Sequence, residues 1–165
     1  MKKISEPQPE IKETGARQFV GQCIQTQLSE NRTSELWQGF APRIKEVEHR
    51  VPSGSFSLQV YFHDFMKEVF SPFKKKKKWA GVEVSDTSNI PTAMEILHIP
   101  AGRWAVFTYK GTAANFHIFA QYIYGIWLPT SGEQLDNRPH FEQMLPDYLG
   151  HGHPDAEELV WIPIK

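Results

Sequence analysis

Glu142 is the residue in this sequence that most needs a chemical explanation. It is the single carboxylate in "HFEQML" (140–145), where Phe141 and Met144 are large and apolar. If this run is a strand, Glu142 shares one face with Met144, and Phe141 lies on the other face. If only the Phe141 face of the strand is covered, the Glu142 carboxylate lies in water, and its charge needs no special explanation. A strand covered on both faces buries it, and a buried carboxylate must be protonated, paired or matched by a cationic partner.

Glu83 raises the same question in "WAGVEVS" (79–85), because alternation places it on the face of Trp79. An acid beside an aromatic ring can form part of a cage for an organic cation. The alternative is a solvent-facing strand residue next to a partly exposed tryptophan. Further candidates are the tyrosines and tryptophans, which join an aromatic ring to a polar atom. These include Tyr61, Tyr109, Tyr122, Tyr124, Trp127 and Trp161.

Three other features predict no site. The lysine run 74–78 is typical of a solvated loop between strands, and a localisation or phosphate-binding role is the less favoured alternative because the rest of the chain supplies no basic face. His151 and His153 lie two residues apart in a Gly/Pro loop without a third ligand, so no metal site is predicted. Cys23 has apolar neighbours, which is typical of a buried and inert thiol. The sequence also lacks a glycine-rich phosphate loop, and we expect no cofactor.

The elements that would position these residues occur in the same order in two parts of the chain. In residues 16–85 the hydrophobic pattern predicts a strand, a helix that Pro42 interrupts, and two more strands. These four elements cover residues 16–28, 29–49, 57–63 and 79–85.

The second part, residues 94–165, begins with strands around the turn Pro100-Ala101-Gly102. A helix over residues 112–129 follows, apolar on two sides and ended by Pro129, and then two strands. The repeated order predicts an α+β fold of two pseudo-symmetric strand–helix–strand–strand units. We expect an antiparallel sheet with two main helices and a central ligand cleft. Residues 1–15 are expected to be an N-terminal arm before a single domain, residues 16–165.

Composition excludes several classes of protein. A net charge of −1 and a pI near 6.7 give no basic face, so we expect no direct binding to nucleic acid. No apolar run approaches the ~18 residues that a membrane helix needs. A single cysteine and an N-terminus without an apolar segment predict a cytoplasmic protein.

Several segments together resemble the GyrI-like domain, also called the AraC-type effector-binding domain of bacterial transcription activators. The resemblance covers residues 16–164, essentially the whole chain, and the order and spacing of its motifs carry it. The matching motifs are Trp79 to Val84, Ile99 to Gly102, Ala105 to Phe107 with Lys110-Gly111, Trp127 to Pro129, Phe141-Glu142, and Trp161 to Ile164.

The resemblance implies a stand-alone effector-binding domain, a monomer or homodimer, that takes a small, lipophilic and cationic molecule into a central cleft. It implies that Glu142 meets the charge of the ligand among aromatic rings, with Met144 where the family often has an aromatic residue. The expected ligand-binding residues are Glu142, Glu83, Trp79, Tyr61, Tyr109, Tyr124, Trp127, Met144 and Trp161.

Two other functions remain open at this point. Some GyrI-like proteins are implicated in hydrolysing electrophilic small molecules with a cleft glutamate and a tyrosine. Glu142 would then activate water while Tyr109, Tyr122 or Tyr124 polarises the leaving group. The third function is a protein-interaction module like the gyrase-inhibitory members, which the near-neutral composition does not favour. We expect binding rather than catalysis, although the sequence alone does not separate the two.

Overall fold

The computed structural model describes residues 6–26, 32–61 and 76–165, and its framework is an antiparallel sheet of eight strands. The strands are β1 (Glu10–Thr14), β2 (Arg17–Thr26), β3 (Ser55–Tyr61), β4 (Lys76–Glu83), β5 (Glu95–Ile99), β6 (Gly102–Lys110), β7 (His140–Met144) and β8 (Glu157–Ile164). Their order in the sheet is β1-β6-β8-β7-β3-β4-β2-β5.

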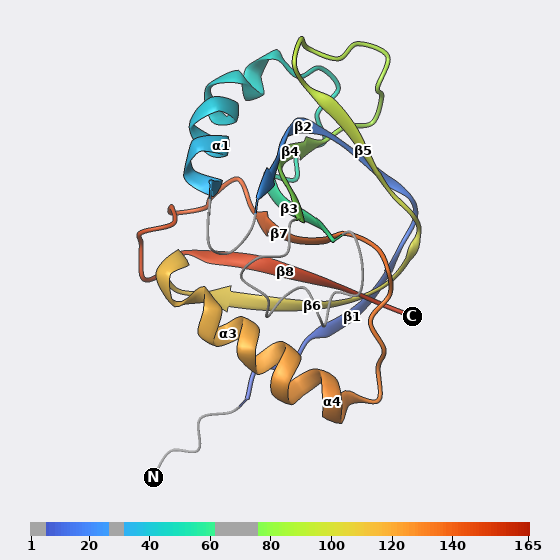
Figure 1. Ribbon diagram of the computed structural model, residues 1–165, viewed down its shortest axis with the longest axis vertical. Coiled ribbons are helices and arrows are strands. Elements are labelled where there is room, and N and C mark those ends of the chain that lie inside the picture. Colours follow the sequence, from blue (N-terminus) through green and yellow to red (C-terminus); the bar gives the residue numbers. More distant parts are fainter. Residues whose placement is uncertain (1–5, 27–31, 62–75) are drawn as a thin grey trace.

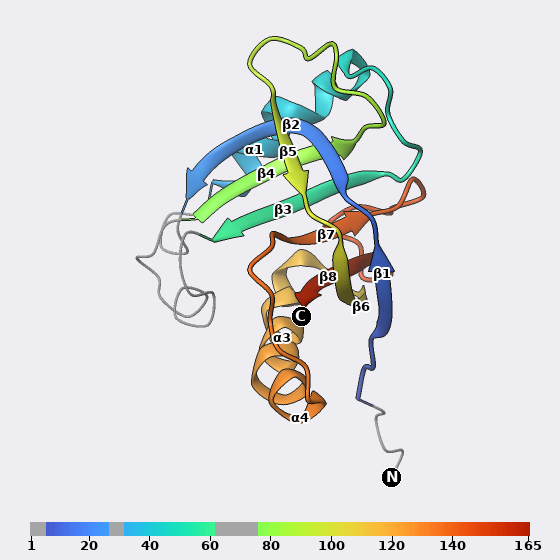
Figure 2. The same cartoon turned by 90° about the vertical axis from the view of Figure 1, so that its right-hand side faces the viewer.

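The strand order shows the pseudo-symmetry of the two halves. β3 and β7 pair at the centre, and each is followed outward by two strands of its own half, β4 and β2 on one side and β8 and β6 on the other. The outermost strands are exchanged: β1 leads into β2 but pairs with β6, while β5 leads into β6 but pairs with β2 (Figure 2). The predicted α+β fold with an antiparallel sheet is therefore confirmed.

The helices cover one face of the sheet at its two ends (Figure 1). Helix α1 (Thr33–Phe40) packs over β2 and β4, where Leu36 and Phe40 meet Val20 and Val82. The second helical segment packs over β6 and β8, and Ile123, Tyr124 and Trp127 are buried there against Phe107 and Ile162. The opposite face of the sheet holds a separate core, rich in aromatic rings.

Both helical segments depart from a single regular helix. After α1, Pro42 stands in the first turn of a 3₁₀ helix, η1 (Ala41–Glu46), where its missing N–H costs nothing. The second segment consists of α3 (Phe116–Tyr122), a π-helical turn η3 (Ile123–Trp127) and α4 (Leu128–Ser131), after the short 3₁₀ turn η2 (Ala113–Asn115). Pro129 lies in the first turn of α4, so the prediction that it ends the helix was wrong.

The same helical segment is buried on one side only. Ile118 and Ile126 are exposed by 59% and 50%, which contradicts the predicted burial on two sides. No helix among the described residues is long and apolar enough to cross a membrane.

Two segments that were predicted to be irregular form strands. Residues Glu10–Thr14, within the predicted arm, form β1 along the edge of β6. Lys76, Lys77 and Lys78 begin β4, so a solvated loop was the wrong interpretation of these three lysines. Lys74 and Lys75 lie outside the described residues, as do residues 62–63 at the end of the strand predicted over 57–63.

Candidate functional site

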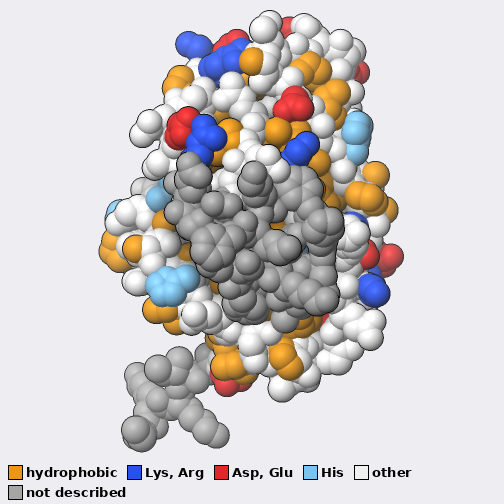
Figure 3. Space-filling view, in the orientation of Figure 1, with side chains coloured by type: hydrophobic (Ala, Val, Ile, Leu, Met, Phe, Trp, Pro, Cys, Tyr) orange, Lys and Arg blue, Asp and Glu red, His pale blue; other side chains and the backbone are white. Residues whose placement is uncertain are grey.

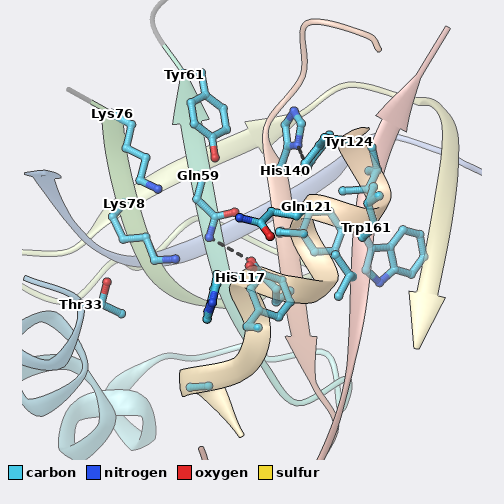
Figure 4. A pocket seen from close by; sticks show the side chains of 18 of the residues that line it. Thr33, Gln59, Tyr61, Lys76, Lys78, His117, Gln121, Tyr124, His140 and Trp161 are labelled. Atoms are coloured by element: carbon cyan, nitrogen blue, oxygen red, sulfur yellow. Dashed lines mark hydrogen bonds between the residues drawn. The ribbon is translucent and has the colours of Figure 1, made fainter. Parts of the chain in front are cut away.

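A cavity of about 520 Å³ opens on the helix-bearing face of the sheet. The central strands β3, β4, β7 and β8 form its floor, and residues of α3 and η3 form one wall (Figure 4). Thr33 at the start of α1 also contributes to the lining. The cavity therefore lies where the two pseudo-symmetric halves meet.

The strand register brings polar side chains of three strands together on this floor. Gln59 of β3 is flanked by Lys78 of β4 on one side and by His140 of β7 on the other. One step along the strands, Ser57 is flanked by Ala80 and Glu142. Residues two apart on a strand share a face, so all these side chains point to the helix-bearing face.

Glu142 is half-buried in the cavity and accepts a hydrogen bond of 2.9 Å from Nε2 of Gln59. Its neighbour Phe141 points the other way, into the aromatic core. The Glu142 carboxylate is thus neither fully exposed to bulk water nor enclosed in a packed core, the two alternatives that the sequence left open. It faces the cavity instead. In that position it can meet a ligand.

Two lysines share the cavity with this acid, and sequence reasoning missed both. Lys78 is 9% exposed and Lys76 is half-buried. Desolvation lowers the pKa of Lys76 to about 8, and it lowers the pKa of Lys78 as well, while Glu142 acts in the opposite direction on both. The alternation of Lys76, Lys78, Ala80 and Val82 on one face of a strand was the signal that could have revealed them.

The polar pair Tyr124–His140 lies at another side of the cavity. The Tyr124 hydroxyl is 3.0 Å from Nδ1 of His140, and the Tyr61 ring meets the imidazole edge-to-face at 5.2 Å. Burial lowers the pKa of His140 to about 3 and raises that of Tyr124 well above its usual value. Both groups are therefore neutral at pH 7, and they offer hydrogen bonds rather than charge.

Of the nine residues expected to bind ligand, four line the cavity: Glu142, Tyr61, Tyr124 and Trp161. The Trp161 ring stacks on Phe141 at a centroid distance of 5.3 Å within the aromatic core. Trp161 therefore contributes both to the lining of the cavity and to the core on the opposite face of the sheet. Further lining residues that the sequence did not single out are Gln59, Lys76, Lys78, His117, Gln121 and His140.

The other expected residues lie elsewhere. Trp79 is in the aromatic core, and Trp127, at the end of η3, is buried between the second helical segment and the sheet. Tyr109 packs against Phe116 outside the cavity, and its hydroxyl donates a 2.5 Å hydrogen bond to the carbonyl of Thr112. Met144 is buried, 3% exposed, and is not part of the lining.

Glu83 lies outside the cavity and has a partner from its own chain. It accepts bonds of 2.7 and 3.1 Å from Nε and Nη2 of Arg17. The Arg17 guanidinium also lies 5.1–5.6 Å from four ring centroids, those of Phe19, Phe56, Phe141 and Trp161. An acid-and-aromatic cage does form around a cation at Glu83, but the cation is Arg17.

Charge elsewhere is mixed. Acidic and basic side chains lie interspersed on the face seen in Figure 3, outside the grey atoms. Within the described ranges, no three His, Cys, Asp or Glu side chains gather closely enough to hold a metal ion. Among the described residues, the cavity is therefore the candidate site that we consider further.

Comparison with known proteins agrees with this arrangement. The chain is 29% identical over 130 residues to the transcriptional regulator BrlR of Pseudomonas aeruginosa, a match that covers 79% of this chain and 45% of the regulator. The chain therefore spans less than half the length of that relative.

Solved structures share the fold at low sequence identity. The structure of SAV2435 bound to tetraphenylphosphonium aligns with a TM-score of 0.74 at 12% identity, over 98% of this chain and 94% of that one. A hydrolase encoded by lin2189 from Listeria innocua aligns with a TM-score of 0.57 at 12% identity, over 96% and 92% of the two chains. Such low identities show the shared fold alone.

The family profile settles the classification. The profile of the GyrI-like small molecule binding domain matches residues 7–165, nearly the whole chain. This extent agrees with the eight-stranded sheet, its two helical segments and the cavity between them. The chain belongs to the GyrI-like small-molecule binding domain family.

Proposed function

We propose that this chain binds a lipophilic small molecule in the cavity between its two halves, and that Glu142 recognises a cationic or hydrogen-bond-donating group of that ligand. The observation that carries the proposal is the position of Glu142 on the cavity floor, half-buried and held by Gln59. A carboxylate in a partly desolvated site interacts with an opposite charge far more strongly than one at the surface.

The apolar part of the cavity suits a ring-containing ligand. Phe116, Ile123 and Val160 supply apolar surface around the polar floor. Pockets of this kind, mostly apolar with a few convergent polar groups, are typical of small-molecule sites. The neighbour SAV2435, which binds the lipophilic cation tetraphenylphosphonium, supports the same ligand class by analogy.

A regulatory role is part of the proposal, because the relative BrlR is a transcriptional regulator. Ligand occupancy would be the signal that this domain supplies.

Hydrolysis has weaker support from the geometry. Tyr109, expected to assist Glu142 in catalysis, lies outside the cavity with its hydroxyl bonded to Thr112. Tyr124 does line the cavity, but its hydroxyl is engaged with His140. With the Tyr109 hydroxyl held by Thr112 and the Tyr124 hydroxyl held against His140, we favour binding over hydrolysis.

Tryptophan fluorescence tests the proposal directly. We expect tetraphenylphosphonium and cationic dyes to quench the fluorescence saturably, since Trp161 borders the cavity. Glu142→Gln keeps the shape and an oxygen for Gln59 but removes the charge. It should weaken binding at least fivefold, about 1 kcal/mol.

The matched control is Glu157→Gln, an exposed carboxylate on β8, which should leave the affinity unchanged. Equal affinities for wild type and Glu142→Gln would show that Glu142 does not recognise the ligand. Turnover of an electrophilic ester by the wild type, lost in Glu142→Gln, would instead identify a hydrolase.

A further inference from the structure

The two cavity lysines have no role in the recognition of a cation. Lys76 and Lys78 lie two residues apart on β4 and face the cavity, whereas Lys77 between them is exposed. Figure 4 shows both amino ends directed toward the middle of the cavity, toward Gln59. A simple cation would meet these two ammonium groups as well as Glu142.

The lysines also lack a counter-ion within the described part of the chain. No carboxylate among these residues lies within salt-bridge distance of either ammonium, and Nζ of Lys76 instead lies 5.6 Å from the Tyr61 ring centroid. Glu142, whose charge acts on both lysines, is hydrogen-bonded to Gln59. Removing an ammonium from water without a partner is costly.

Glu158 does not remove this imbalance. It lies outside the cavity lining, and burial together with the charge of Glu142 raises its pKa to about 7. Near neutral pH it is therefore protonated in a large fraction of molecules. Within the cavity lining, the single carboxylate of Glu142 therefore faces two lysines.

We infer that the ligand of this cavity carries an acidic group as well as its cationic or donor group, and that Lys76 and Lys78 receive the acidic group. The inference rests on the proposed function, since it concerns the same cavity. Glu142 with Gln59 forms one pole of the site, and the two lysines on the neighbouring strand form the other. The ligand class is thus an amphoteric, ring-containing molecule with a carboxylate, and a purely cationic molecule should bind less well.

The lowered pKa values of both lysines are consistent with this arrangement. Both shifts reflect burial, which disfavours the ammonium forms. A bound carboxylate would restore these forms, because an opposite charge nearby favours ionisation. The same two groups then contribute both affinity and selectivity.

Two dyes that differ in one group test the inference. Rhodamine 110 carries a cationic xanthene and a free carboxylate, and rhodamine 123 is its methyl ester. We expect the wild-type protein to bind rhodamine 110 about tenfold more tightly in fluorescence polarisation, which corresponds to ~1.4 kcal/mol. Without the lysines, Glu142 would favour the ester, which has the higher net positive charge.

The variants separate the lysines from the rest of the cavity. Lys78→Met and Lys76→Met should each reduce the preference for rhodamine 110 at least threefold. Lys77→Met, the same change at the exposed position between them, should retain it. Replacing a buried charge with an apolar side chain of similar length is expected to preserve the fold, and a thermal melt of each variant checks this.

Each outcome bears on one of the two proposals. Equal affinity of the wild type for both dyes, with Glu142→Gln weakening both, would overturn the inference and leave the proposed function standing. A preference that survives in both Lys76→Met and Lys78→Met would overturn the inference as well. Failure of the wild type to bind either dye at ~100 µM, a concentration that detects weak binding, would count against both proposals.

Discussion

Arg17 and Glu83 show how one residue of this protein depends on another that is distant in sequence. Their ion pair joins β2 to β4, and each side chain is 14% exposed. Alternation in the sequence indicates the acid and its aromatic neighbour, but the cation that we expected there was a ligand. The partner could not be predicted, because it is set by the pairing of β2 with β4, 66 residues apart for this contact.

Glu83→Gln should therefore destabilise the fold without affecting the cavity. It leaves the Arg17 guanidinium among aromatic rings without its counter-charge, and we expect the free energy of unfolding to fall by about 2–4 kcal/mol. Urea denaturation measures this loss. The cavity lies on the helix-bearing face, so dye affinity should stay at the wild-type value.

Glu46→Gln is the matched control, because Glu46 pairs with Arg43 at an exposed position. An exposed, solvent-screened pair contributes little to stability, so this variant should unfold at nearly the same urea concentration as the wild type. A similar loss in both variants would show that burial of the Arg17–Glu83 pair has no special weight.

At the scale of elements, alternation predicted the strands and their faces well. It placed Glu142 on the face opposite Phe141 and separated Ala80 and Val82 from Trp79, as the two cores of the sheet show. Residues 76–78 were predicted to be a loop because a lysine run is usually solvated, whereas they begin β4. The π-helical turn and the continuation past Pro129 depend on local packing, which a periodicity of 3.6 residues does not contain.

The backbones of the neighbouring strands β2 and β4 approach each other closely at a pair of glycines. Gly21 lies opposite Gly81, and a Cβ on Gly21 would overlap the carbonyl oxygen of Ala80. Gly21→Ala should lower the free energy of unfolding by about 1–3 kcal/mol, since backbone atoms must shift to admit the methyl group. Thermal and urea denaturation should agree on the loss.

Gly15→Ala is the comparison, because a Cβ at this position meets nothing within 4 Å. Its effect should stay within about 0.5 kcal/mol of the wild type. If Gly21→Ala were as stable as Gly15→Ala, β2 and β4 could accommodate a methyl group at Gly21, and the close approach of the two strands would be contradicted.

At the scale of the whole molecule, the buried His140 makes the stability of the fold depend on pH. His140 has a pKa of about 3 in the folded protein because burial disfavours its charged form, whereas an unfolded chain has a value near the ordinary 6.5. Between these values the unfolded chain binds a proton that the folded protein does not. Stability contributed by neutral His140 is therefore complete above pH ~6.5 and is lost progressively as the pH falls toward 3.

His140→Gln should flatten this dependence. Between pH 7 and pH 4 we expect the wild type to lose about 3 kcal/mol more than the variant, at ~1.4 kcal/mol for each pH unit between 6.5 and 4. Other groups, including Glu158, titrate in both proteins and cancel in the difference. His153→Gln, at an exposed position, should follow the wild type, and a parallel pH profile for His140→Gln would contradict the neutral state of His140.

The exchange of β1 and β5 between the halves constrains the order of events during synthesis. Glu10 pairs with Val106, and Arg17 pairs with Ile99, so both outer ladders need the first strands of the second half. The central ladder is also late, because Ser55 pairs with Met144. Long-range pairings of this kind slow folding. The edges of β1, β2 and β3 therefore stay unpaired until β6, β5 and β7 have been synthesised, and this interval is when the nascent chain most needs protection from aggregation.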